Sequence, residues 1–179
     1  MVLATGIEAS GMSEAIKAVL KDRTAVLEAL PEHPALRAIL AWKPEALRDA
    51  KFDRGELTLT IAPEEIRAAA GTVQAAGYNA FEDVTAVDWF PALPRFQLSY
   101  HIVSHRLKER IRLRVLLDGD SPSIESITAV WPAANFYERE VFDLFGIRFA
   151  GHPNLRRIMM PDDWQGHPLR KDYPVEGYR

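Results

Sequence analysis

The chain has 179 residues, 47% of them hydrophobic, and 22 basic against 25 acidic residues give it a formal net charge of −3. This length and apolar content predict one domain with a real core and exclude a disordered chain. The slight acidic surplus gives no support for nucleic-acid binding. Cysteine is absent, which excludes disulfides, iron–sulfur ligation and thiolate zinc sites within this chain.

The N-terminus has no basic segment followed by a continuous apolar core, so we expect no secretory signal there. The apolar runs also fall short of the roughly 18 residues that a membrane helix needs. We therefore expect a chain that reaches a membrane only through partner proteins.

The first third of the chain predicts a helix, a mixed region and a strand. Residues 12–34 have apolar positions at helical spacing, with Ser13 as a candidate N-cap and prolines at the end. Residues 35–55 are ambiguous between helix and strand, and a strand is possible over residues 47–52. Residues 56–61 alternate apolar and polar side chains, which is typical of a half-buried strand. Residues 62–77 indicate a second helix.

The middle of the chain consists of strand-like stretches, at residues 81–90, 95–105, 109–119 and 124–131, followed by a short helix at 135–146. Blocks of helices and strands, with successive strands close in sequence, favour an α+β fold. We predict a mixed, largely antiparallel sheet with helices packed on one face. Residues 1–149 would form the domain, with a helical segment at 1–34, and residues 150–179 an extended C-terminal arm that binds a partner.

The helix at 135–146 carries an unusual group of charges. Asn135 and Glu138 have the spacing of a capping box, and Gly146 stands where a helix commonly ends. Arg139 and Asp143 are four residues apart, so we expect them to pair. Two carboxylates beside an arginine could also form an acid–base site, but a structural ion-pair network is favoured because no nucleophile or ligand set accompanies them.

Two further patterns leave alternatives open. If residues 106–115 form one strand, Arg106, Lys108, Arg110, Arg112 and Arg114 share one face. That face is either solvated or docks against an acidic partner. His101 and His105 would share a metal only on a helix, but their surroundings alternate like a strand and would separate them by roughly 13 Å.

The tail contains the residue types that dominate protein interfaces. It is rich in proline and glycine, which discourage regular structure, yet it holds Trp164, Tyr173 and several arginines. We expect an ordered arm that lies across a partner or across its own domain, with order supplied by the partner. At least one of Arg156 and Arg157 should meet a carboxylate of a neighbour or of the 135–146 helix. The alternative is a frayed terminus.

The segment from the helix into the tail resembles a known signature. Its pattern is Glu-Arg-Glu, an acid and two apolar residues, then a spaced His, a basic residue and an apolar pair, here Glu138, Arg139, Glu140, Asp143, Leu144, Phe145, His152, Arg156, Ile158 and Met159. The chain resembles the 30-kDa (C) subunit of respiratory complex I, the proton-translocating NADH–quinone oxidoreductase. The similarity runs from about Arg54 to the C-terminus.

The resemblance implies a cofactor-free structural subunit of the peripheral arm of that enzyme, beside the 49-kDa (D) subunit and on the cytoplasmic side of the inner membrane. FMN and iron–sulfur clusters would be held by partner subunits, and this chain would have no catalytic, cofactor-binding or metal-binding residue. The residues expected at partner contacts are Glu138, Arg139, Glu140, Asp143, His152, Arg156, Arg157, Trp164, His167, Arg170, Lys171, Asp172 and Tyr173.

Two alternatives remain at this point. The same signature would serve the equivalent subunit of a membrane-bound hydrogenase, or of a quinone reductase fed by ferredoxin or a reduced deazaflavin. A stand-alone hydrolase using His101, His152 or His167 is the alternative of another class. No nucleotide-binding glycine loop and no nucleophile elbow is found in the sequence.

Overall fold

A computed structural model describes residues 19–177 of the chain. The N-terminal part has α2 (Arg23–Ala29), α3 (Pro34–Trp42) and the 3-10 turn η1 (Pro44–Ala46), followed by β1 (Leu47–Asp53) and β2 (Glu56–Ile61). The turn η2 (Pro63–Glu65) and α4 (Ile66–Ala75) come next, and then β3 (Ala80–Asp88), β4 (Phe96–Ser104) and β5 (Glu109–Leu117). The last elements are β6 (Ser123–Glu125), α5 (Ala134–Phe145) and β7 (Arg148–Ala150).

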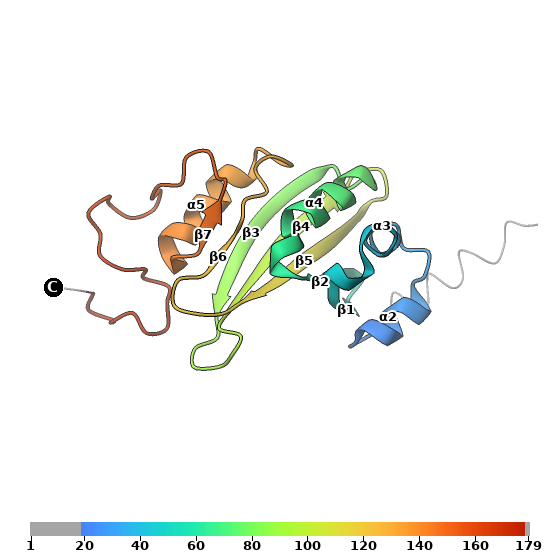
Figure 1. Cartoon of the computed structure of the whole chain (residues 1–179), viewed down its shortest axis with the longest axis horizontal. Helices are drawn as coiled ribbons and strands as arrows, with labels where there is room; N and C mark the ends of the chain where they lie inside the picture. The colour runs from blue at the N-terminus through green and yellow to red at the C-terminus, as the bar shows by residue number, and fades with distance from the viewer. Residues whose placement is uncertain (1–18, 178–179) are drawn as a thin grey trace, which may run out of the picture.

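Five strands form the main sheet in the order β1-β2-β5-β4-β3. Only the β2–β5 pair is parallel, and the other three pairs are antiparallel. The predicted α+β fold with a mixed, largely antiparallel sheet is confirmed. Figure 1 shows α4 lying over the strands and α5 beside β3 at the sheet edge. The short strands β6 and β7 form a separate parallel pair next to α5.

The core lies on one face of the sheet because alternate residues of β4 and β5 point there. On β5 these are Ile111, Leu113, Val115 and Leu117, all buried. The opposite face of β5 carries Arg110, Arg112 and Arg114, which contact the carboxylates of Glu56 and Asp49 on β2 and β1. Acidic residues of neighbouring strands therefore match the basic stripe within the chain. Arg106 and Lys108 precede β5, so their predicted place on the strand face was wrong.

The strand at residues 56–61 forms as predicted, but it is not half-buried. Thr58 and Thr60 are buried as well as the apolar residues, because β2 lies inside the sheet between β1 and β5. Arg114 of β5 donates from Nε to the Thr60 hydroxyl at 2.9 Å. The alternation reports side-chain chemistry correctly, but the number of neighbours on each face depends on strand order.

The predicted first helix is shorter than expected. It begins at Arg23, where Asp22 is the N-cap and its carboxylate accepts a hydrogen bond from the Ala25 amide. Leu20 instead pairs with Phe52 of β1 through two backbone hydrogen bonds. Pro34 begins α3. Ser13, the predicted N-cap, lies outside the described residues.

The later predictions fare differently. The helix predicted over 135–146 is confirmed as α5, and Gly146 ends it in the left-handed conformation at φ +74°. Its predicted cap was wrong, since Ala133 is the N-cap residue and makes no side-chain hydrogen bond. Of the strand predicted over 124–131, only the first residues belong to β6. Within residues 19–177, no helix is long and apolar enough to cross a membrane.

Candidate functional site

Helix α5 directs its charged side chains to different surroundings. Glu138 and Asp143 are fully buried and Arg139 is nearly so, whereas Glu140 is exposed. Asp143 forms its ion pair with Arg157 of the arm. Arg139 donates to the backbone carbonyls of residues 156 and 157 instead, at 3.1 Å each. The predicted Arg139–Asp143 pair was wrong, because both side chains turn from the helix towards the arm.

Asp143 fixes the start of the arm without any secondary structure. Its Oδ2 accepts hydrogen bonds from three successive backbone amides, those of residues 158, 159 and 160, at 2.8–2.9 Å. Its Oδ1 accepts from Arg157 Nη1 at 2.5 Å. Burial alone would raise the pKa of Asp143, but these amides and the guanidinium outweigh it and lower the pKa below its usual value. The carboxylate is thus ionised and fully satisfied in a dry site.

Arg157 joins the helix end to the next turn of the arm. Its Nη1 also donates to the Asp143 carbonyl at 3.2 Å, and its Nη2 donates to the carbonyls of Trp164 and Gly166 at 3.0 Å each. The expectation that Arg156 or Arg157 meets a carboxylate of the helix is confirmed by the Arg157–Asp143 pair. Arg156 is exposed. The paired guanidinium of Arg157 therefore organises the arm, and Arg156 is available at the surface.

The arm also completes the C-terminal end of α5. The last carbonyls of a helix have no partner within the helix. Here Nδ1 of His167 donates to the Asp143 carbonyl at 2.8 Å, the Leu169 amide donates to Leu144 at 3.0 Å, and Arg170 Nε donates to Phe145 at 2.6 Å. Because a carbonyl can only accept, Nδ1 of His167 carries the ring hydrogen. The predicted hydrogen-bonding role of His167 has a definite partner in the chain.

His152 marks the first turn of the arm. Its Nε2 lies 3.1 Å from the Asn135 carbonyl at the start of α5, and its Nδ1 accepts from the Asn154 amide at 3.0 Å. Burial lowers the pKa of His152, and the carbonyl and the nearby Arg139 act in opposite directions on it. A neutral ring with hydrogen on Nε2 fits both contacts. Both ring nitrogens are occupied, so the ring has no free nitrogen for a hydrolytic role.

A second attachment point lies at the other end of the arm. Arg95 is buried and donates two hydrogen bonds to Asp88, at 3.0 and 2.9 Å, and one to Asp172 of the arm at 2.7 Å. The Lys171 amide also donates to Asp88, at 2.9 Å. Burial would raise the pKa of Asp88, but Arg95 and the two backbone amides of Lys171 and Phe90 lower it to about 2. Sequence reasoning missed Asp88 and Arg95.

Glu138 does not belong to either attachment point. It accepts hydrogen bonds from the Ser126 hydroxyl at 2.6 Å and from the Ile127 amide at 2.8 Å. Burial raises the pKa of Glu138 to about 7 against these two bonds. The predicted capping role was wrong, because Glu138 ties α5 to the segment after β6. Glu138 and Asp143 contact different segments, which favours the structural network over an acid–base pair.

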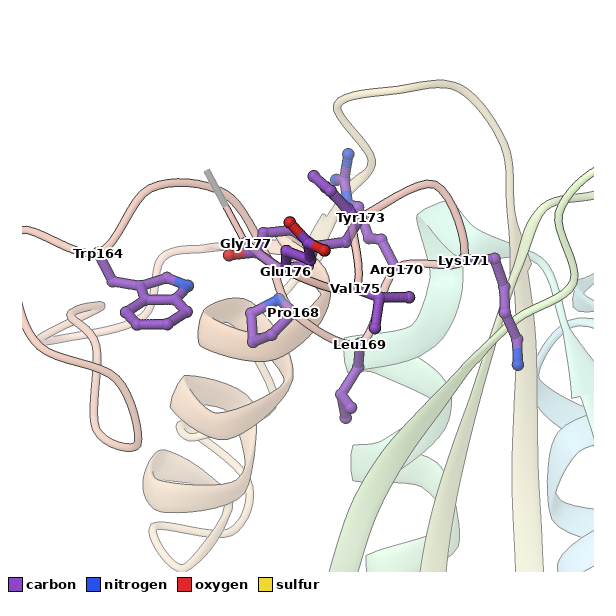
Figure 2. Close-up of a pocket in the computed structure, with 10 residues that line it drawn as sticks. Trp164, Pro168, Leu169, Arg170, Lys171, Tyr173, Val175, Glu176 and Gly177 are labelled. Atoms are coloured by element: carbon purple, nitrogen blue, oxygen red, sulfur yellow. The ribbon is translucent and has the colours of Figure 1, made fainter. Parts of the chain in front are cut away.

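The end of the arm surrounds an open cavity of about 550 Å³. Figure 2 shows the side chains of Trp164 and Lys171 at opposite ends of it. Trp164 and Leu169 expose large parts of their apolar surface. The Tyr173 hydroxyl donates to the Gln165 carbonyl at 3.3 Å, across the arm. The cavity is thus part of the arm surface rather than a recess in the domain.

The histidines of β4 do not form a metal site. His101 Nδ1 lies 2.6 Å from Asp83 on β3, and Arg112 of β5 donates to its Nε2 at 2.8 Å. His105 follows the end of the strand, so the strand prediction for this stretch is confirmed. Across residues 19–177, no group of three His, Cys, Asp or Glu side chains is placed to hold a metal ion.

Comparison with known proteins agrees with the resemblance in the sequence. Residues 59–179 match the family described as respiratory-chain NADH dehydrogenase, 30 Kd subunit. The C-type subunit of the NADH-quinone oxidoreductase of Roseiflexus sp. is 42% identical over 150 residues, which cover 82% of this chain and 86% of that protein. Its counterpart in Citrifermentans bemidjiense is 48% identical over 145 residues, or 79% of this chain and 90% of that protein.

Two solved structures are similar as well. One is the trypsin-resistant fragment 1–134 of Nqo5, with a TM-score of 0.59 and 30% identity over 68% of this chain and 99% of the fragment. The other is a chain of an archaeal membrane-bound sulfane sulfur reductase, with a TM-score of 0.68 and 26% identity over 78% of this chain and 84% of that chain. The family match and the curated relatives together show that the chain belongs to the 30-kDa subunit family of the respiratory-chain NADH dehydrogenase.

Proposed function

We propose that the chain is a structural subunit of the peripheral arm of an NADH–quinone oxidoreductase, with no redox centre of its own. That enzyme passes electrons from NADH through FMN and iron–sulfur clusters, held by partner subunits, to quinone, coupled to proton translocation. The names of the relatives from Roseiflexus and Citrifermentans support the assignment to this enzyme. The chain would lie beside the 49-kDa subunit on the cytoplasmic side of the membrane, bound through its partners.

The observation that carries the proposal is the way the arm is fastened. Asp143 and Arg157 hold the arm backbone against α5, and Arg95 holds its far end. Meanwhile Glu140, Arg156 and Met159 are exposed. An arm that is ordered before binding loses less conformational entropy when a partner covers it. The charged and apolar side chains on its outer side therefore form a prepared surface for a partner subunit.

The arm residues divide into two groups by their contacts. His152, Arg157, His167, Arg170 and Asp172 make hydrogen bonds within the chain that shape the arm. Glu140, Arg156, Trp164 and Lys171 expose their side chains, and we propose these as the partner contacts. Glu138, Arg139 and Asp143 would act on the partner indirectly, by positioning the arm.

Co-purification tests the proposal. A tagged chain in its native host should bring down the redox subunits of the enzyme, with FMN and iron in the purified material. Replacing Arg156 with Glu, together with Met159→Ser, should reduce the recovered partner subunits by about tenfold or more, because interface charges and apolar contacts are reversed or lost. The control is Lys21→Glu, at an exposed site near β1. Recovery of the chain alone, without FMN and iron, would contradict the proposal.

Surface substitutions test the arm more sharply than its removal. Truncation before His152 would delete the partners of Asp143 and of the last carbonyls of α5. Such a truncation damages the domain as well as the interface, since a buried carboxylate would lose its partners. The exposed substitutions above leave these contacts in place.

A related enzyme with another electron donor is the second candidate. The similarity to a chain of the archaeal sulfane sulfur reductase favours it, since that respiratory membrane complex uses a subunit of the same fold. The same purification separates the two candidates. NADH-dependent quinone reduction and bound FMN are expected for the first, and neither for the second.

A further inference from the structure

The loop between β3 and β4, residues 89–95, displays large apolar side chains in solvent. Trp89 is 51% exposed, Phe90 50% and Leu93 75%, and Val87 at the end of β3 is 38% exposed. Figure 1 shows this loop extending beyond the end of the sheet. Single exposed apolar residues are ordinary, but a contiguous group of this size marks an interaction site.

The loop is held in one shape by hydrogen bonds at its base and within it. The Trp89 amide donates to the Arg95 carbonyl at 2.7 Å, the Ala92 amide donates to the Trp89 carbonyl at 2.8 Å, and the Phe90 amide donates to Asp88 at 2.9 Å. The buried Arg95 guanidinium lies 5.0 Å from the centre of the Phe90 ring. The apolar side chains are therefore presented by a fixed backbone, which lowers the entropy lost on binding.

The same charged group fixes the loop and the arm. Asp88 accepts from Arg95 and from the Lys171 amide, and Asp172 of the arm binds Arg95. The loop is thus continuous with the arm surface, so a protein that covers the end of the arm is adjacent to the loop. A contact at one of the two surfaces supports a contact at the other.

The charges at the base of the loop do not favour a lipid surface. Asp88, Asp120 and Asp172 surround Arg95, and Arg170 and Lys171 are the neighbouring cations. The three acids and three bases cancel, whereas binding to an anionic membrane requires a surplus of basic residues. A neutral polar rim around exposed aromatic and aliphatic side chains is the composition of a protein interface.

We propose that Trp89, Phe90 and Leu93 insert into an apolar recess of a neighbouring protein subunit of the same enzyme. This proposal rests on the proposed function, because it takes the chain to be part of that complex. It adds a second contact, at the β3–β4 loop, to the one made by the arm. The occupant is a protein with an apolar recess, and neither a membrane nor a second copy of this chain.

Site-specific photo-cross-linking in the whole complex identifies the occupant. A photoreactive phenylalanine analogue at position 93 should cross-link to an identified redox or membrane subunit of the purified enzyme, through apolar residues of that subunit. The matched control carries the analogue at Val19, which is 51% exposed and lies next to β1 at the opposite edge of the sheet. A cross-link to lipid, a cross-link to a second copy of this chain, or no cross-link overturns the proposal.

Substitution measures the strength of the contact. Trp89→Ser combined with Leu93→Ser should reduce the partner subunits recovered with the tagged chain by about tenfold or more, since Trp is a residue typical of interface hot spots. Leu93→Met alone should retain recovery. The melting temperature of the isolated variant should match that of the wild type, because the removed side chains are exposed.

The outcomes separate the two proposals. If the wild-type chain recovers no redox subunit, both the proposed function and the loop contact fail. If the wild type recovers them and the double serine variant does so equally well, only the loop contact fails.

Discussion

The domain up to β7 and the arm at residues 151–177 are stabilised in different ways. In the domain, apolar side chains of the sheet and of α3, α4 and α5 form one buried cluster. In the arm, none of residues 151–177 is buried, and only Leu155 packs in part against that cluster. The arm is held instead by polar groups of the domain that are themselves buried, chiefly Asp143 and Arg95. Ordering a long segment therefore does not require a core of its own.

The comparison predicts different responses to substitution. Loss of one apolar residue from a shared core is distributed over many contacts. Loss of one buried charge in the arm attachment removes several hydrogen bonds at once and leaves their partners unsatisfied. We therefore expect few positions to control the arm, with large effects at each of them.

The largest effect is expected for Asp143→Asn. The amide keeps the shape of the side chain but loses the charge that binds Arg157 and three backbone amides. Removing one partner of a buried ion pair costs about 3–5 kcal/mol. The detached arm should then be at least about 100-fold more populated, as measured by hydrogen exchange of the amides of residues 158–160.

The matched control for this substitution is Glu140→Gln. Glu140 is an exposed carboxylate on the same helix, and no hydrogen bond of its side chain is found among residues 19–177. Exchange of the arm amides should stay at the wild-type rate in this variant. Equal exchange in the Asp143 and Glu140 variants would show that the arm is held by something other than the buried carboxylate.

An effect of about 3 kcal/mol, confined to the domain, is expected for Glu138→Gln. Its pKa of about 7 lies above the reference value of 4.5, so the folded protein keeps a proton that the unfolded chain loses between these pH values. The free energy of unfolding of the wild type should therefore fall by about 3 kcal/mol as the pH rises from 4.5 to 7. Urea unfolding at several pH values measures this fall.

The glutamine variant should lack this contribution, since its side chain does not titrate. The difference between the two unfolding curves isolates Glu138 from the other ionisable groups. Exchange of the arm amides should be unchanged, because Glu138 contacts Ser126 and Ile127 and not the arm. Parallel pH dependence of wild type and variant would mean that the Glu138 carboxyl is ionised at low pH in the folded state.

The sequence allowed the regular elements to be predicted wherever one face is buried. The spacing in α5 and the glycine at its end identify the helix, and the alternation in β2, β4 and β5 identifies strands. The start of the first helix was misjudged because Val19 and Leu20 fit a helical pattern. Leu20 pairs with Phe52 of β1, far along the chain, and no local pattern records that pairing.

The partners of the buried charges could not be predicted in the same way. The spacing of Arg139 and Asp143 suggested a pair on one helix, yet the backbone amides of the arm compete for the carboxylate and win, because they reach a dry site. The contact between Lys171 and Asp88 spans 83 residues. Such a pair depends on where two loops meet after folding, and sequence spacing carries no information about that meeting.

The smallest effect, about 1–2 kcal/mol between two matched variants, measures how closely the arm is coupled to α5. Gly146 and Gly119 both have positive φ, so alanine costs about 1 kcal/mol at either position. At Gly146 an added Cβ would lie 2.5 Å from the His167 ring and 2.7 Å from Arg170 Nη2, whereas Gly119 has nothing within 4 Å. Only Gly146→Ala should therefore displace the arm and weaken the hydrogen bonds from His167 and Arg170 to α5.

A double-mutant cycle with His167→Ala distinguishes this coupling from simple backbone strain. In that background the alanine at 146 no longer meets an imidazole, so its extra cost over Gly119→Ala should shrink, as measured by thermal or urea unfolding. An unchanged difference would mean that the cost at Gly146 arises from the backbone of α5 and not from the arm. The arm would then rest on the helix end without restraining it, and its order would depend on Asp143 and Arg95 alone.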